Sequence, residues 1–288
     1  MNFYKTLEDY INAMPSLPTS LTKVLEICDN PQTSPGDLNH VISLDPVLVG
    51  RVLKLINSAY YGMEQPVKSL TRAIIMLGIN TVKNLALSTT AIVHLSEKLS
   101  FGLDLEGLWR HSLCVGVSAK LIARKRGIDP KLLEEYFTAG FLHDIGKIPI
   151  NALLAEEYLK TISIADRERK SLFDVETETL GLNHCSIGAM IAYSWKLEGA
   201  VGDTIIYHHE CNEYTGNHKD ILYSVVVANR FASIADIGFS GDRHRRPLPS
   251  HIWETLDISS DIFDEIKENV YDEIQKAEIF LKIISRES

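Results

Sequence analysis

Residues that could bind a metal ion recur on otherwise apolar helical faces of this sequence. Ten histidines are present in 288 residues, and five share such a face, with one aspartate beside them: His111, His143, Asp144, His184, His208 and His209. A single inward histidine is typically a hydrogen-bonded core residue. Burying all of these groups separately costs about 1–3 kcal/mol for each one left unpaired, whereas a shared metal satisfies them together. Imidazole and carboxylate ligands predict a divalent transition metal, one or two ions of Fe, Mn, Zn or Ni.

The densest motif is Leu-His-Asp-Ile-Gly-Lys at residues 142–147. His143 and Asp144 are adjacent, so both can reach one ion from the end of a helix, and Gly146 lets the backbone turn there. Lys147 adds a positive charge where a phosphate oxygen could dock. If the protein is an enzyme, we expect Asp144 and Lys147 to be its catalytic residues. The alternative for Lys147 is an ordinary surface lysine.

The elements that position these residues are predicted to be helices, because helical periodicity recurs along the chain and strand alternation does not. Ser34 and Asp45, each followed by proline, predict helix starts. Ser69 and Asn80 predict two more starts, and Gly78 predicts a helix end. The sequence therefore predicts an all-α fold.

Two domains are expected. The periodicity weakens between residues 97 and 107, where two glycines occur, and we place the boundary there. The prediction is an N-terminal helical bundle, residues 1–104, packed on a C-terminal helical domain, residues 105–288.

Segments of the second domain decide how the candidate ligands are held. Amphipathic helices are expected over residues 108–127 and 132–145, and a last helix from Ile262 to Ile284. Residues 236–250 are expected to form an exposed loop. Its basic run, residues 243–246, is interpreted as solvated, with a ligand site as the alternative.

Composition and charge limit the function classes. Apolar residues make up 45% of the chain, and the formal net charge is −9 at pH 7. An acidic protein gains little from counterion release, so broad nucleic-acid binding is not expected. The apolar runs are too short to span a bilayer, and the first residues do not resemble a signal peptide. The four cysteines form no CxxC pair, so we expect free thiols, no membrane association and a cytoplasmic location.

The histidine pattern resembles a known superfamily. Residues 141–149 are similar to the signature of the HD superfamily of metal-dependent phosphohydrolases. The intervals that separate the six candidate ligands resemble the HD-GYP branch, which hydrolyses cyclic dinucleotides at a two-metal centre. The resemblance implies a first metal position, held in part by His111 and His143, and Asp144 as the bridge between the two ions. The second position it implies is held by His184, His208 and His209.

Two departures from the HD-GYP pattern bear on activity. The last ligand of that branch is an aspartate, and Asn229 stands at the matching place here. An amide oxygen is a poorer ligand than a carboxylate, so the first position is expected to be weak and the second complete. Residues 214–217 also replace the Gly-Tyr-Pro segment. Because two-metal hydrolysis depends on both ions, the departures imply impaired catalysis with metal binding retained.

The first hundred residues point to a subfamily. Residues 14–18, 42–46, 56–62 and 73–78 resemble the HDOD family, most distinctively in the Asn-Ser-Ala-Tyr-Tyr-Gly block. That resemblance implies a bacterial-type signal-transduction module that contacts a signalling partner, a small phosphorylated ligand, or both. One alternative is an active metal-dependent phosphodiesterase acting on a cyclic or linear nucleotide. The other is a metal-free adaptor for protein interaction.

Overall fold

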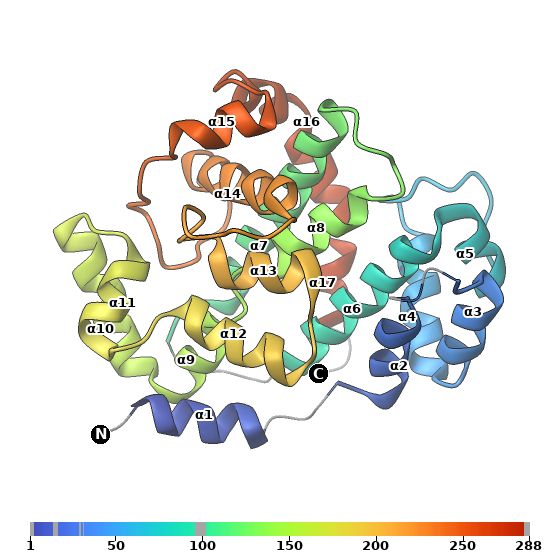
Figure 1. The fold of residues 1–288 in the computed structure, drawn as a ribbon, viewed down its shortest axis with the longest axis horizontal. Coiled ribbons are helices and arrows are strands. Elements are labelled where there is room, and N and C mark those ends of the chain that lie inside the picture. The colour runs from blue at the N-terminus through green and yellow to red at the C-terminus, as the bar shows by residue number, and fades with distance from the viewer. Residues whose placement is uncertain (1–2, 14–16, 29, 31, 96–101, 285–288) are drawn as a thin grey trace.

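The computed structural model describes residues 3–13, 17–28, 30, 32–95 and 102–284. Every regular element within these ranges is a helix, so the predicted all-α fold is confirmed (Figure 1). The first six are α1 (Phe3–Ala13), α2 (Thr19–Cys28), α3 (Pro35–Ser43), α4 (Pro46–Ile56), α5 (Leu70–Leu77) and α6 (Ile79–Leu95). The others are α7 (Leu105–Lys125), α8 (Leu133–Leu142), α9 (Lys147–Leu153), α10 (Ala155–Glu168), α11 (Leu172–Leu180), α12 (His184–Ser194), α13 (Gly199–Tyr207), α14 (Lys219–Ile234), α15 (Ser250–Leu256), α16 (Ile262–Ala277) and α17 (Ile279–Ile284).

Local caps set three of the helix starts in the first half. Ser34 forms a capping box with Asp37, the Asp45 side chain accepts from the Leu48 amide, and the Ser69 side chain caps α5. These three predictions are confirmed. The prediction for Asn80 is wrong, because α6 already begins at Ile79. Gly78, at φ +89°, ends α5, and its carbonyl accepts the Val82 amide of α6, which leaves no room for a separate cap.

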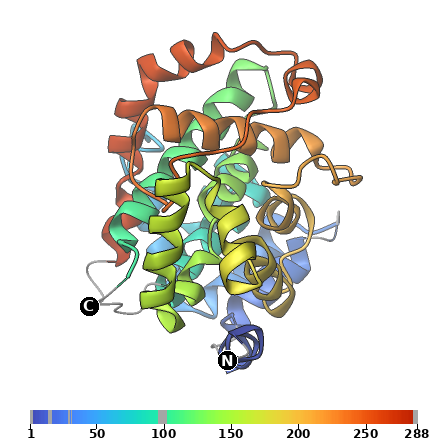
Figure 2. The same cartoon turned by 90° about the vertical axis from the view of Figure 1, so that its left-hand side faces the viewer.

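Helices α7 and α8 pack at the centre of the second half (Figure 1). The two backbones touch at a pair of glycines, where a Cβ added to Gly140 would lie 2.9 Å from the Gly116 Cα. Helices α14 and α16 cover other sides of α7, and α10 and α11 form a hairpin beside the core (Figure 2). This close crossing places the end of α8 next to the inward face of α7.

The two halves pack through aromatic rings. Tyr60 stands between them, with ring centroids 5.7 Å from Phe137 of α8 and 5.7 Å from Phe280. Its hydroxyl accepts from Lys120 of α7 at 2.9 Å. The N-terminal helical bundle is therefore packed on the C-terminal helical part, as predicted.

The first and last helices each pack on the opposite half of the molecule. Helix α1 lies against α9 and α12, whereas α17 lies against α4 and α6. Residues 96–101 and the side chain of Ile284 lie outside the description, so the boundary at 104/105 stays a prediction. The expected single last helix is wrong: it breaks between Ala277 and Ile279, where Phe280 turns fully into the core.

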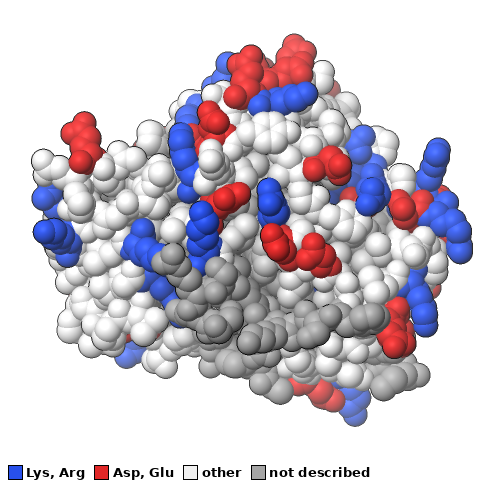
Figure 3. Space-filling model, turned by 180° about the vertical axis from the view of Figure 1, so that it is seen from behind, with Lys and Arg blue, Asp and Glu red and all other residues white. Residues whose placement is uncertain are grey.

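The surface and the cysteines also bear on the predictions from composition. No helix in the described ranges combines the length and apolar character needed to cross a membrane. Acidic and basic side chains are interspersed on the face shown in Figure 3. Cys28, Cys114, Cys185 and Cys211 are all thiols outside any disulfide, as predicted.

Candidate metal centre

The turn between α8 and α9 carries the centre of the candidate site. Helix α8 ends at Leu142, earlier than predicted, and residues 143–146 form a turn before α9 begins at Lys147. Gly146 presses this turn against α12, because a Cβ there would lie 1.9 Å from the His184 carbonyl oxygen. The turn therefore brings Asp144 to the start of α12.

Asp144 is the point where the candidate ligands meet. Its Oδ1 lies 3.3 Å from His184 Nε2 and 3.5 Å from His208 Nε2. Its Oδ2 lies 3.3 Å from His143 Nε2 and 2.7 Å from Lys147 Nζ. All four partner side chains are buried. Residues from the α8–α9 turn, α12 and the end of α13 thus converge on one carboxylate.

The outer hydrogen bonds fix how the imidazoles face this carboxylate. His184 Nδ1 lies 2.6 Å from Glu176 Oε2, and His143 Nδ1 lies 2.6 Å from the Gly140 carbonyl oxygen. His208 Nδ1 lies 3.0 Å from the Thr204 carbonyl oxygen. These oxygens only accept hydrogen bonds, so each Nδ1 carries the proton. In a neutral ring the Nε2 atom then presents a lone pair toward Asp144.

The result is a buried cluster of acceptors. Burial lowers the pKa of His208 to about 3 even beside Asp144, so that ring is neutral. Burial alone would raise the pKa of Asp144, but the Lys147 ammonium, which donates to Oδ2, helps to hold this pKa well below its usual range, so the carboxylate is ionised. His143 Nε2 and Asp144 Oδ1 have no hydrogen-bond partner among the described residues. Among the described residues, Lys147 donates to Asp144 Oδ2, whereas His143 Nε2 and Asp144 Oδ1 face each other's neighbourhood without a donor, and such unpaired acceptor atoms fit a bound cation.

The other predicted ligands divide into two groups. His111 Nε2 lies 2.9 Å from Asn229 Oδ1, and ligand atoms of His111, His143 and Asp144 lie within 4.8 Å of one another. Burial, with a contribution from Arg245, lowers the pKa of His111 well below its usual value. The His209 ring stands 4.5 Å from that of His208, between centroids, and its Nε2 has no partner in the described part of the chain.

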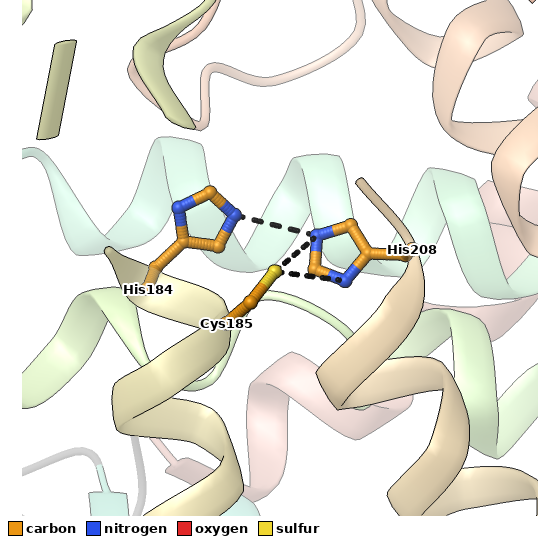
Figure 4. Close-up of side chains that lie close together, drawn as sticks. All are labelled: His184, Cys185 and His208. Carbon is orange, nitrogen blue, oxygen red and sulfur yellow. Dashed lines mark hydrogen bonds between the residues drawn. The ribbon is translucent and has the colours of Figure 1, made fainter. Parts of the chain in front are cut away.

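Two residues near the cluster were missed by the sequence interpretation. Cys185 Sγ lies 3.7 Å from His208 Nδ1, and ligand atoms of His184, Cys185 and His208 lie within 4.8 Å of one another (Figure 4). Its position directly after His184 was the available signal. Burial, then Asp144, raises the pKa of this thiol well above its usual value. Glu176 lies in α11 with no predicted ligand next to it in the sequence, and gave no such signal.

Lys147 is not the surface lysine of the alternative interpretation. Its side chain is 0% exposed, and Nζ is paired with Asp144. The ammonium therefore compensates the buried carboxylate. A phosphate could reach Lys147 only by displacing this pair, and its catalytic role stays a prediction.

A cavity of about 110 Å³ opens to solvent beside the cluster. Its lining includes His208, His209, Asn229, Arg230, Arg245 and Arg246. The interpretation of the run 243–246 as solvated is correct for Arg243 and Arg246, which are exposed. It is wrong for Arg245, which is partly buried and whose Nη2 atom lies 3.3 Å from His111 Nε2.

Glu176 gives a direct test of how His184 is held. We expect Glu176→Gln to weaken metal affinity about 10- to 100-fold, because the carboxylate orients His184 and increases its basicity. Affinity is measured by competition with a chelator of known strength. Glu178→Gln is the control, since Glu178 is exposed and pairs with Lys170. Equal affinity for both variants would show that Glu176 does not support a metal ligand.

An all-helical chain with this His–Asp cluster has a site that could hold a metal ion. Residues 14–211 match the HDOD domain, and the chain belongs to the HDOD family. An uncharacterized protein of Treponema pallidum is 28% identical over 256 residues. That match covers 89% of this chain but 48% of the relative, so the chain spans about half the length of the curated relative it matches.

Solved structures share the fold. An HDOD domain protein of unknown function from Geobacter sulfurreducens is 25% identical, with a TM-score of 0.75 over 96% of this chain and 97% of that one. A protein from Shewanella amazonensis, named as a candidate phosphohydrolase, is 23% identical, with a TM-score of 0.70 over 96% and 97%. At 23% identity, the similarity to the Shewanella protein shows a shared fold and nothing about function.

Proposed function

We infer that this protein is a regulatory HDOD protein of bacterial signal transduction that binds one divalent transition metal and has impaired hydrolytic activity. The observation that carries the metal is the set of lone pairs facing Asp144 from His143, His184 and His208. Fe, Mn, Zn and Ni all accept such ligands. Asp144, His184 and His208, with His209 beside them, would hold the ion at the second position. When bound, the metal would supply Lewis acidity to an anionic oxygen.

Impaired hydrolysis is supported by the chain's own residues at the first position. His111 is hydrogen-bonded to the neutral amide of Asn229, where the HD-GYP branch has a carboxylate. Lys147 already occupies Oδ2 of Asp144, the oxygen nearer to His143. A second ion would therefore meet a weaker ligand set and a competing ammonium.

The cavity supports an anionic ligand, and we propose a small phosphorylated molecule. Arg230 and Arg245 line it, and no carboxylate in the described ranges lies within ion-pair distance of either. Arginine side chains bind phosphate oxygens in paired hydrogen bonds. A ligand there would contact the metal centre through the His208 and His209 side of the cavity, and its presence would be relayed to a signalling partner.

Elemental analysis and a phosphodiesterase assay on one sample test the proposal. Protein purified without chelators is expected to hold about one metal per chain, bind inorganic phosphate, and hydrolyse bis-para-nitrophenyl phosphate no faster than a His208→Ala control. Metal-dependent hydrolysis that His208→Ala abolishes would favour the enzyme alternative. Protein without metal, even after incubation with Fe, Mn, Zn or Ni, would favour the adaptor.

A further inference from the structure

The loop after α14 is anchored directly on the helix that carries His111. The Phe239 amide donates to the Gly107 carbonyl oxygen at 2.9 Å. Gly238, at φ +69°, packs so closely on α7 that a Cβ would lie 2.2 Å from the His111 backbone nitrogen. A side chain at position 238 would separate the loop from α7, so the approach depends on this glycine. The loop is therefore held in register with His111.

This anchored loop holds Arg245 in one place. Its Nε donates to Ser233 Oγ, and its Nη2 donates to Ser240 Oγ at 3.0 Å. Its carbonyl oxygen accepts from Arg230 Nη1 at 3.4 Å. The guanidinium is thus fixed from α14 and from its own loop, with Nη2 3.3 Å from His111 Nε2.

The position of this guanidinium coincides with the first metal position. His111 Nε2 has a single site for a proton or a ligand, and Arg245 Nη2 and Asn229 Oδ1 both already contact it. A metal ligated by His111 would need that same site, next to a fixed positive charge. Two cations cannot share it without strong repulsion.

We propose that the Arg245 guanidinium is a built-in cation that stands in for the first metal, so that the centre takes a single ion, at the second position. The inference rests on the proposed function, because it presumes that the second position binds metal. This effect of Arg245 differs from that of Asn229 alone, which would only weaken the binding of an ion at the first position. His111, His143 and Asp144 still lie within ligating reach of one another, so removing the guanidinium should reopen the first position.

The test is to remove the guanidinium and supply the missing carboxylate together. The double variant Asn229→Asp with Arg245→Met is expected to rise from about one to about two Mn²⁺ per chain, measured by elemental analysis after equilibration. Paired ions should also show exchange coupling by electron paramagnetic resonance. The matched control is Asn229→Asp with Arg243→Met, because Arg243 lies on the same loop but is exposed over Phe239. The control variant should still bind about one Mn²⁺ per chain.

The outcomes separate the two proposals. A second ion in Asn229→Asp alone or in the control would overturn the role of Arg245, as would a single ion in the double variant. Wild-type protein that binds none of Mn²⁺, Fe²⁺, Zn²⁺ and Ni²⁺ would instead reject the proposed function. If the double variant does not fold, anomalous scattering from wild-type crystals grown with Mn²⁺ still decides. Density beside His184 and His208 alone is expected, and density beside His111 overturns the inference.

Discussion

Asp144→Ala is expected to abolish metal binding and to destabilise the fold by about 3–5 kcal/mol, because removing one partner leaves a buried charge uncompensated. The charge in question is Lys147, whose side chain is 0% exposed and whose ammonium is paired with Asp144 at 2.7 Å. The same substitution removes the carboxylate on which His143, His184 and His208 converge. Urea unfolding measures the stability, and elemental analysis measures the metal.

A double variant separates the two losses. Asp144→Asn with Lys147→Met removes both charges, so most of the stability should return while the metal stays absent. Retention of metal by Asp144→Ala would remove this carboxylate from the site. Equal stability of the single and double variants would show that the ion pair is not the cause of the destabilisation.

Gly146→Ala is expected to destabilise the fold by more than about 3 kcal/mol, above the usual range for overpacking. The added methyl would lie 1.9 Å from the His184 carbonyl oxygen and 2.6 Å from the Gly188 amide nitrogen. Both are backbone atoms of α12 and cannot rotate away. The α8–α9 turn would therefore separate from α12, and metal affinity should fall together with stability. Thermal unfolding and a metal titration measure the two effects.

Gly50→Ala is the matched control. Gly50 lies within α4, and a Cβ there would meet no atom within 4 Å. This variant should be stabilised by about 0.5–1 kcal/mol, because alanine is the better helix former. A Gly146→Ala protein as stable as wild type, with normal metal binding, would contradict the close contact between the turn and α12.

Features that depend on neighbours in the chain could be predicted from the sequence. A cap needs a serine or aspartate within three residues of the amide that it binds, which is why Ser34, Asp45 and Ser69 were recognised as helix starts. The inward helix faces placed His111 and His184 correctly in the core, because helical spacing alone decides which residues share a face. His143 and His208 are also buried, but they lie just past the ends of α8 and α13, where helical spacing no longer applies. The assignment of individual ligands stays a prediction.

Features that depend on packing could not be predicted. Glu176 reaches His184 only because α11 and α12 pack side by side. Arg245 turns inward only because Gly238 anchors its loop on α7, and its charge made a solvated position the natural expectation. Similarly, the burial of Lys147 depends on its ion pair with Asp144, which forms only in the folded chain.

Helix α1 belongs to the N-terminal half of the chain but packs on two helices of the C-terminal half, next to the candidate metal centre. Leu7 and Ile11 of α1 are buried where this helix lies against α9 and α12, the helices that begin at Lys147 and His184. If metal binding changes how α9 and α12 are held, the packing of α1 and the occupancy of the centre would be coupled, and such coupling is reciprocal. A binding partner that displaces α1 would then lower the metal affinity. Loss of the metal would weaken the packing of α1 by the same factor.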